Sequence, residues 1–105
     1  DLGSQPLVLL THGRDDGLPA DFEALWLKWQ KQVALLSTSS MLIRADNAGH
    51  AIQLEYPDLT AEAFNLVIQA VRTSAPLPAC AATPLPALDS TCLDPTGATP
   101  WRTRT

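Results

Sequence analysis

The chain has 105 residues, with a hydrophobic content of 46% and a charged content of 17%. This is the composition of one small globular domain and excludes a chain that is disordered throughout. The net charge is −4 with seven Lys and Arg residues, which argues against the concentrated basic face that nucleic-acid binding requires. No apolar run approaches the roughly 20 residues of a membrane span, so we expect neither nucleic acid nor a membrane as a partner.

The sequence starts at Asp1, without a methionine or a signal-peptide pattern. This start is typical of a processed or truncated piece. The location is left open, with a cytoplasmic one favoured over a secreted one.

The first predicted elements are a buried strand and an amphipathic helix. The strand is the unalternating apolar run at residues 7–10, which is typical of a strand in a parallel sheet. A loop with two glycines, two aspartates and a proline follows at residues 11–19. The helix is predicted from Asp21, its N-cap, to Leu36. Its apolar residues recur at three- and four-residue spacing and are expected in the core: Phe22, Leu25, Trp26, Trp29, Val33 and Leu36.

A second strand and a second helix complete the predicted domain. The strand covers Met41–Ala45, and a polar turn that ends in Gly49-His50 follows it. The helix starts at Pro57 and ends near Arg72. Its expected buried stripe is Leu59, Ala63, Leu66, Val67, Ala70 and Val71. Connections of this length between strands predict an α/β fold, β-α-β-α, with parallel strands and a right-handed crossover.

Residues 74–105 have a different composition. They are rich in Pro, Ala and Thr without any period, which predicts a low-complexity, largely disordered tail. Cys80 and Cys92 lie in this tail, and their spacing leaves open whether they pair. No C-x-x-C motif or His/Cys cluster has the spacing of a metal site, so we expect no metal or other cofactor.

His50 is the first candidate for a functional residue. It follows a strand and a glycine-containing turn, an arrangement that can fix an imidazole as a general base because histidine titrates near neutral pH. On the chemistry alone, a surface histidine in a turn is the favoured interpretation of the same residues.

The stretch around His50 carries a family resemblance. Gly49 and His50, with Ile52 and Pro57 downstream and a helix after them, resemble the C-terminal end of the α/β-hydrolase family. The resemblance extends over roughly Pro6 to Arg72. It implies that residues 1–73 form the C-terminal part of an α/β-hydrolase domain, a partial α/β-hydrolase fold, in which His50 is the catalytic base.

The same resemblance selects an acid for the site. The loop Gly13–Pro19 is similar to the family's G-x-x-D pattern, which implies Asp16 as the acid that orients the histidine. Asp15 is the near alternative, and an acid upstream of this chain is another. His12 is a second candidate in its own right, interpreted as a neutral loop histidine.

The nucleophile of the family is absent from this sequence. No G-x-S-x-G elbow occurs, so the resemblance implies a C-terminal hydrolase fragment that is inactive alone. In the full-length enzyme it would help hydrolyse an ester or related bond of a small-molecule substrate. The sequence does not distinguish ester hydrolysis from carbon–halogen or epoxide hydrolysis, in which the family uses an aspartate nucleophile.

The competing hypothesis is a non-catalytic binding remnant of the same fold. Two strands and two helices leave sheet edges and helix faces uncovered. We therefore expect the isolated piece to self-associate.

Overall fold

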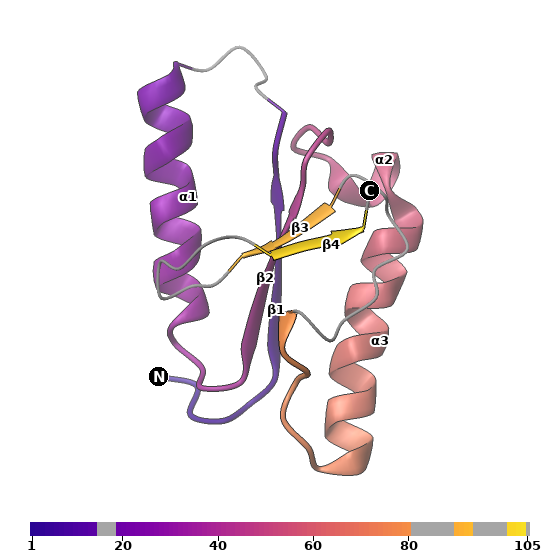
Figure 1. The fold of residues 1–105 in the computed structure, drawn as a ribbon. Helices are drawn as coiled ribbons and strands as arrows, with labels where there is room; N and C mark the ends of the chain where they lie inside the picture. The colour runs from indigo at the N-terminus through magenta and orange to yellow at the C-terminus, as the bar shows by residue number, and fades with distance from the viewer. Residues whose placement is uncertain (15–18, 81–89, 94–100, 105) are drawn as a thin grey trace.

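The structure is a computed structural model that describes residues 1–14, 19–80, 90–93 and 101–104. Its helices and strands, shown in Figure 1, are β1 (Leu7–His12), α1 (Ala20–Ala34), β2 (Ser40–Ala45), α2 (Ile52–Glu55), α3 (Pro57–Thr73), β3 (Ser90–Leu93) and β4 (Trp101–Arg104). In this part of the chain the strands form one sheet in the order β1-β2-β3-β4.

The sheet is mixed. β1 pairs with β2 in parallel, with Leu7 opposite Ser40 and His12 opposite Ala45, so the predicted parallel pair is confirmed. β3 pairs antiparallel with β2, and β4 pairs antiparallel with β3. The fold is therefore a small mixed α/β sheet with helices, in which the predicted order β-α-β-α holds from β1 to α3.

The two long helices cover opposite faces of β1. The side chain of Thr11 accepts a hydrogen bond from Trp26 of α1, whereas Val8 and Leu10 lie against α3. Alternate residues of a strand point to opposite faces, so α1 and α3 form separate layers on either side of the sheet (Figure 1).

β2 provides the centre of the core. Met41, Leu42 and Ile43 are at most 1% exposed, because β2 has a strand on each side and helices against its faces. The main cluster of buried residues consists of Met41, Ile43, Ala45, Ala48, Ile52, Leu59 and Cys92.

The structure corrects the predicted start and face of α1. The helix begins at Ala20 after Pro19, and Asp21 lies in the first turn instead of at the N-cap. The expected core stripe is largely exposed: Trp29 is 45% exposed, and Phe22, Leu25, Val33 and Leu36 are 39–46% exposed. Trp26 is the one half-buried residue of that stripe. The other residues of α1 that are buried or half-buried are Glu23, Leu27, Gln30, Lys31 and Ala34.

The structure also corrects the predicted tail. Ser90–Leu93 is a buried strand, β3, instead of disordered chain, and residues 101–104 form β4. Cys80 and Cys92 form a disulfide, which links the segment after α3 to β3. The remaining tail residues of the prediction, 81–89, 94–100 and 105, lie outside the described part of the chain. Among the described helices, none is long and apolar enough to cross a membrane.

We predict that the disulfide holds β3 on the sheet. It closes a loop with a sequence separation of 12, and the chain-entropy model gives about 3 kcal/mol for a loop of that size. The double variant Cys80→Ser, Cys92→Ser should lose roughly that much free energy of unfolding in a urea titration. Native protein should show no thiol with Ellman's reagent before reduction and two afterwards. A reactive thiol in the unreduced, folded protein would contradict the pairing.

Candidate functional site

The loops that follow β1 and β2 meet at one end of the sheet. Because the two strands are parallel and adjacent, their carboxyl ends lie at the same edge, the edge where such sheets place their sites. The backbone N–H of Arg14 donates to the carbonyl of Ala48 over 3.0 Å. This bond joins the loop after β1 directly to the turn that precedes His50.

Gly13 makes this approach possible. A Cβ atom at Gly13 would lie 2.5 Å from the backbone oxygen of Asp46, a distance that no side chain tolerates. Residue 13 must therefore be glycine, because any side chain there would clash with the backbone of Asp46 in the loop after β2.

Asp46 and Glu55 both bind groups around the turn that precedes His50. Asp46 accepts from Nε of Arg44 at 2.7 Å and from the hydroxyl of Thr91 in β3 at 2.8 Å. Glu55 accepts from the backbone N–H of Gly49 at 2.9 Å and pairs with Arg14 at 3.1 Å. Asp46 thus fixes the start of the turn that precedes His50, and Glu55 fixes its end at Gly49.

Two imidazoles and an indole lie together at this edge. The ring centroid of His50 lies 6.1 Å from that of His12 and 6.1 Å from that of Trp26, and the His12 and Trp26 centroids are 5.5 Å apart. Nε1 of Trp26 donates to Thr11 over 3.0 Å, which fixes the indole against β1. The three rings come from three elements: the end of β1, the middle of α1 and the turn after β2.

The two histidines have different surroundings. His50 is exposed, so its ring is accessible to a reacting group at the edge. The side chain of His12 is 7% exposed, and its Nε2 lies 2.8 Å from Oε2 of Glu23. His12 is therefore the last residue of β1 and not the loop histidine of the prediction, and its buried imidazole has a carboxylate partner.

Glu23 is a site residue that the sequence interpretation missed. Glu23 lies in the first turn of α1, and the structure turns it to the sheet beside Trp26 and Leu27. The signal was present in the spacing, because residues 23, 26, 27, 30 and 34 share one helical face. Glu23, His12 and Trp26 also line a cavity of about 210 Å³.

The predicted acid, Asp16, and its alternative Asp15 lie outside the described residues. Gly13 and Arg14, which precede them in the same loop, contact the turn before His50. Within the described ranges, no three His, Cys, Asp or Glu side chains converge as a metal site.

Comparisons with models of known families, with curated proteins and with solved structures give no match to this chain. What the site can do is therefore inferred from its own residues. An exposed imidazole, fixed at the carboxyl ends of two parallel strands and flanked by a second imidazole with a carboxylate, is suited to proton transfer.

We predict that Gly13→Ala separates the two loops. The added methyl group must displace backbone, and such overpacking costs about 1–3 kcal/mol. Chemical denaturation should show that loss. Asn47→Ala, an exposed change in the turn before His50, serves as control and should stay within about 0.5 kcal/mol of wild type. Equal stability of Gly13→Ala and the control would refute the close contact.

The difference between the histidines predicts their chemical reactivity. Diethyl pyrocarbonate should modify His50 rapidly and His12 slowly, because His12 is buried and bonded to Glu23. Glu23→Ala should accelerate modification of His12 and leave His50 unchanged, as measured by peptide mass spectrometry. Faster modification of His12 than of His50 in wild type would contradict the arrangement.

Proposed function

We propose that this chain supplies the general base of an α/β-hydrolase type of site, with His50 as the base and Asp16 as the acid that orients it. The observation that carries the proposal is the meeting of the two loops. His50 follows the second of two adjacent parallel strands, and the loop after the first strand is bonded to the turn that precedes it. That is the geometry in which an acid after one strand reaches a histidine after the next.

In this proposal His50 accepts the proton of the nucleophile or of the attacking water and later returns it to the leaving group. A carboxylate from the first loop holds the ring in one tautomer and stabilises the imidazolium that forms. Trp26 and His12 form one side of the site and limit the positions that the His50 ring can take. The substrate is a small molecule with an ester or related bond.

The nucleophile would come from outside the 105 residues, because the sequence contains no G-x-S-x-G elbow. In this view the chain is the C-terminal part of a hydrolase. We therefore expect the chain alone to lack hydrolytic turnover.

A second candidate function is a non-catalytic binding module. The observation that favours it is the row of exposed apolar side chains on α1, next to a strand that has no partner on its outer side within the described sheet. A binding module does not need the imidazole of His50. Substitution of His50 should therefore abolish the hydrolase function and leave a binding function unchanged.

The isolated chain provides the first test. With p-nitrophenyl butyrate it should give no turnover above that of an equal concentration of imidazole, and a serine-directed fluorophosphonate should not label it. Turnover that His50→Ala abolishes would show that the chain has a nucleophile and would overturn the fragment proposal.

The second test uses a longer open reading frame that includes this chain and a nucleophile elbow. There His50→Ala should lower kcat by on the order of 10⁴-fold or more, as loss of a triad member does. Asn47→Ala, an exposed change in the turn before His50, is the matched control and should retain most activity. Equal losses in the two variants, or none in His50→Ala, would contradict the assignment of His50 as the base.

A further inference from the structure

We infer that the Cys80–Cys92 disulfide is a redox switch for the turn that presents His50. Reduction by a dithiol releases β3 from the sheet, and the turn then loses one of its anchors. The inference rests on the proposed function in its consequence only, which is that the oxidised form holds the base in place. The coupling itself runs from the disulfide through β3 to the turn, and it is measured without turnover.

β3 is the element that the disulfide controls. It has four residues, all of them buried, and it pairs antiparallel with β2 from Leu42 opposite Leu93 to Ala45 opposite Ser90. A strand of four residues makes few backbone hydrogen bonds, and the disulfide ties it to Cys80 across a sequence separation of 12. The cross-link reduces the chain entropy that β3 would gain by leaving the sheet. Reduction restores that gain, so β3 acquires two states, docked and released.

Thr91 connects β3 to the turn. Its hydroxyl, next to Cys92 in the chain, donates to Oδ2 of Asp46 at 2.8 Å, and Thr91 is 7% exposed. Oδ1 of the same carboxylate accepts from Nε of Arg44 at 2.7 Å. The backbone of Asp46 is also the point that Gly13 contacts. Asp46 therefore joins β3 to the two loops of the site, and release of β3 breaks the bond on its side.

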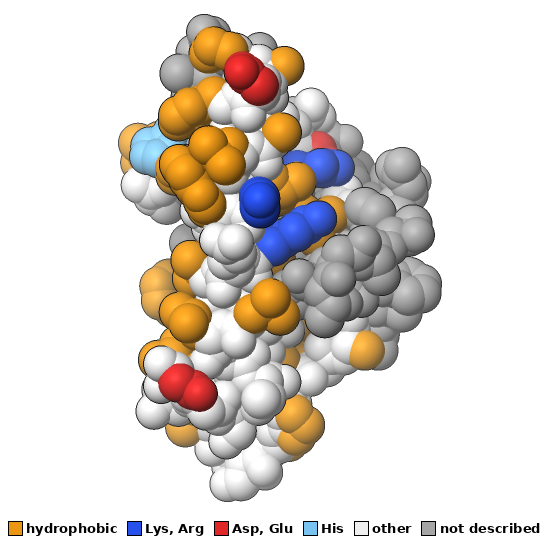
Figure 2. All heavy atoms as spheres, turned by 90° about the vertical axis from the view of Figure 1, so that its left-hand side faces the viewer, with side chains coloured by type: hydrophobic (Ala, Val, Ile, Leu, Met, Phe, Trp, Pro, Cys, Tyr) orange, Lys and Arg blue, Asp and Glu red, His pale blue; other side chains and the backbone are white. Residues whose placement is uncertain are grey.

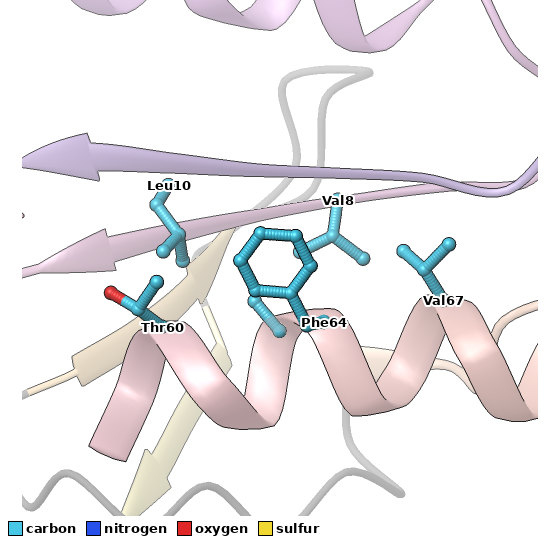
Figure 3. A pocket seen from close by; sticks show the side chains of 6 residues that line it. Val8, Leu10, Thr60, Phe64 and Val67 are labelled. Atoms are coloured by element: carbon cyan, nitrogen blue, oxygen red, sulfur yellow. The ribbon is translucent and has the colours of Figure 1, made fainter. Parts of the chain in front are cut away.

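The elements from β1 to α3 have contacts of their own that do not involve β3. β1 and β2 pair in parallel along their whole length. Figure 3 shows Phe64 directed from α3 toward Val8 and Leu10 of β1, and on the other face Trp26 of α1 is bonded to Thr11. Reduction should therefore open the chain locally and leave these elements folded.

The turn also keeps part of its support when β3 leaves. The N–H of Gly49 remains bonded to Glu55, and the N–H of Arg14 to the carbonyl of Ala48. The end of the turn is thus held, while its start at Asp46 loses a hydrogen bond to a charged group.

The switch acts on how firmly His50 is held and not on its access to solvent. His50 is already exposed, and Figure 2, a view of the α1 side, shows histidine side-chain atoms at the surface. Proton transfer needs a base that is held in position. Reduction should therefore lower the efficiency of the proposed base without uncovering or burying its ring.

The disulfide has one sulfur that a reductant reaches more readily. Cys92 is 0% exposed, whereas Cys80 is half-buried. A thiolate of the dithiol attacks Sγ of Cys80, the S–S bond breaks, and Sγ of Cys92 leaves as a thiolate and takes up a proton. The second thiol of the reductant then displaces Cys80, which also ends as a thiol. Two electrons pass to the protein, and the dithiol becomes a disulfide.

Amide hydrogen exchange of the full chain, oxidised and in dithiothreitol, tests the switch. The amide of Ala48 bonds to the carbonyl of Ala45 across Asp46 and reports the start of the turn. It should exchange about tenfold faster or more after reduction, because a hydrogen bond to a charged group is lost. Amides between β1 and β2 and those of α3 should change little, and re-oxidation with glutathione disulfide should restore slow exchange at Ala48.

Thr91→Val separates the proposed path from the release of β3. It keeps the side-chain shape and the disulfide but removes the donor to Asp46, so Ala48 should exchange faster even in the oxidised protein. Reduction of this variant should add little, because the bond is already absent. Thr73→Val is the matched control: it removes a hydroxyl at the end of α3, where Thr73 bonds to Gln69, and should leave Ala48 unchanged.

The double variant Cys80→Ser, Cys92→Ser guards against effects of the reductant itself. It should match reduced wild type at Ala48, with the amides between β1 and β2 still protected. Unchanged exchange at Ala48 with both thiols free would overturn the switch, as would loss of protection throughout β1, β2 and α3. Full acceleration by reduction in Thr91→Val would overturn the path through Asp46. None of these outcomes bears on His50→Ala in the longer reading frame, so failure of the switch and failure of the proposed base are distinguishable.

Discussion

The parallel pairing of β1 with β2 is the constraint on which the other features depend. It brings the carboxyl ends of two strands to one edge, and the contact between Gly13 and the backbone of Asp46 then joins the loops that follow. Asp46 extends this joint to β3 through Thr91. The turn that presents His50 is thereby supported from β1, from β3 and, through Glu55, from the end of α2.

Within the described sheet, β1 has a partner strand on one side only. It is half-buried between helices on its two faces and has the apolar, uncharged sequence of an interior strand. The apolar sides of α1 and α3 next to it have the same character. A fixed polar site therefore lies at the carboxyl ends of the strands, and an apolar surface lies along β1.

The elements from β1 to α3 could be predicted because each is specified locally. Apolar runs indicated the strands, and three- and four-residue spacing indicated the helices. The face of α1 could not be predicted by the rule that the most apolar stripe is buried. The sheet side of this helix includes Glu23 and Gln30, and there Glu23 pairs with Nε2 of His12.

The prediction of a disordered tail was wrong at residues 90–93 for a different reason. Four residues such as Ser90–Leu93 carry no period of their own, and β3 exists through its pairing with β2 and its disulfide to Cys80. Both are non-local contacts. At the site, His50 was identifiable from its turn, whereas the proximity of His12, Trp26 and Glu23 depends on how α1 packs against β1. No local pattern contains that information.

The measurement that tests this account most directly is the set of nuclear Overhauser contacts among the three rings in the uniformly labelled chain. The ring protons of His50 should show cross-peaks to Trp26 and to His12, since their centroids are 6.1 Å apart. Cross-peaks between β1 and β2 in the parallel register would serve as the internal reference. Strand contacts without any His50 ring contact would mean that the turn does not hold His50 at the site, and the proposed base would lose its structural support.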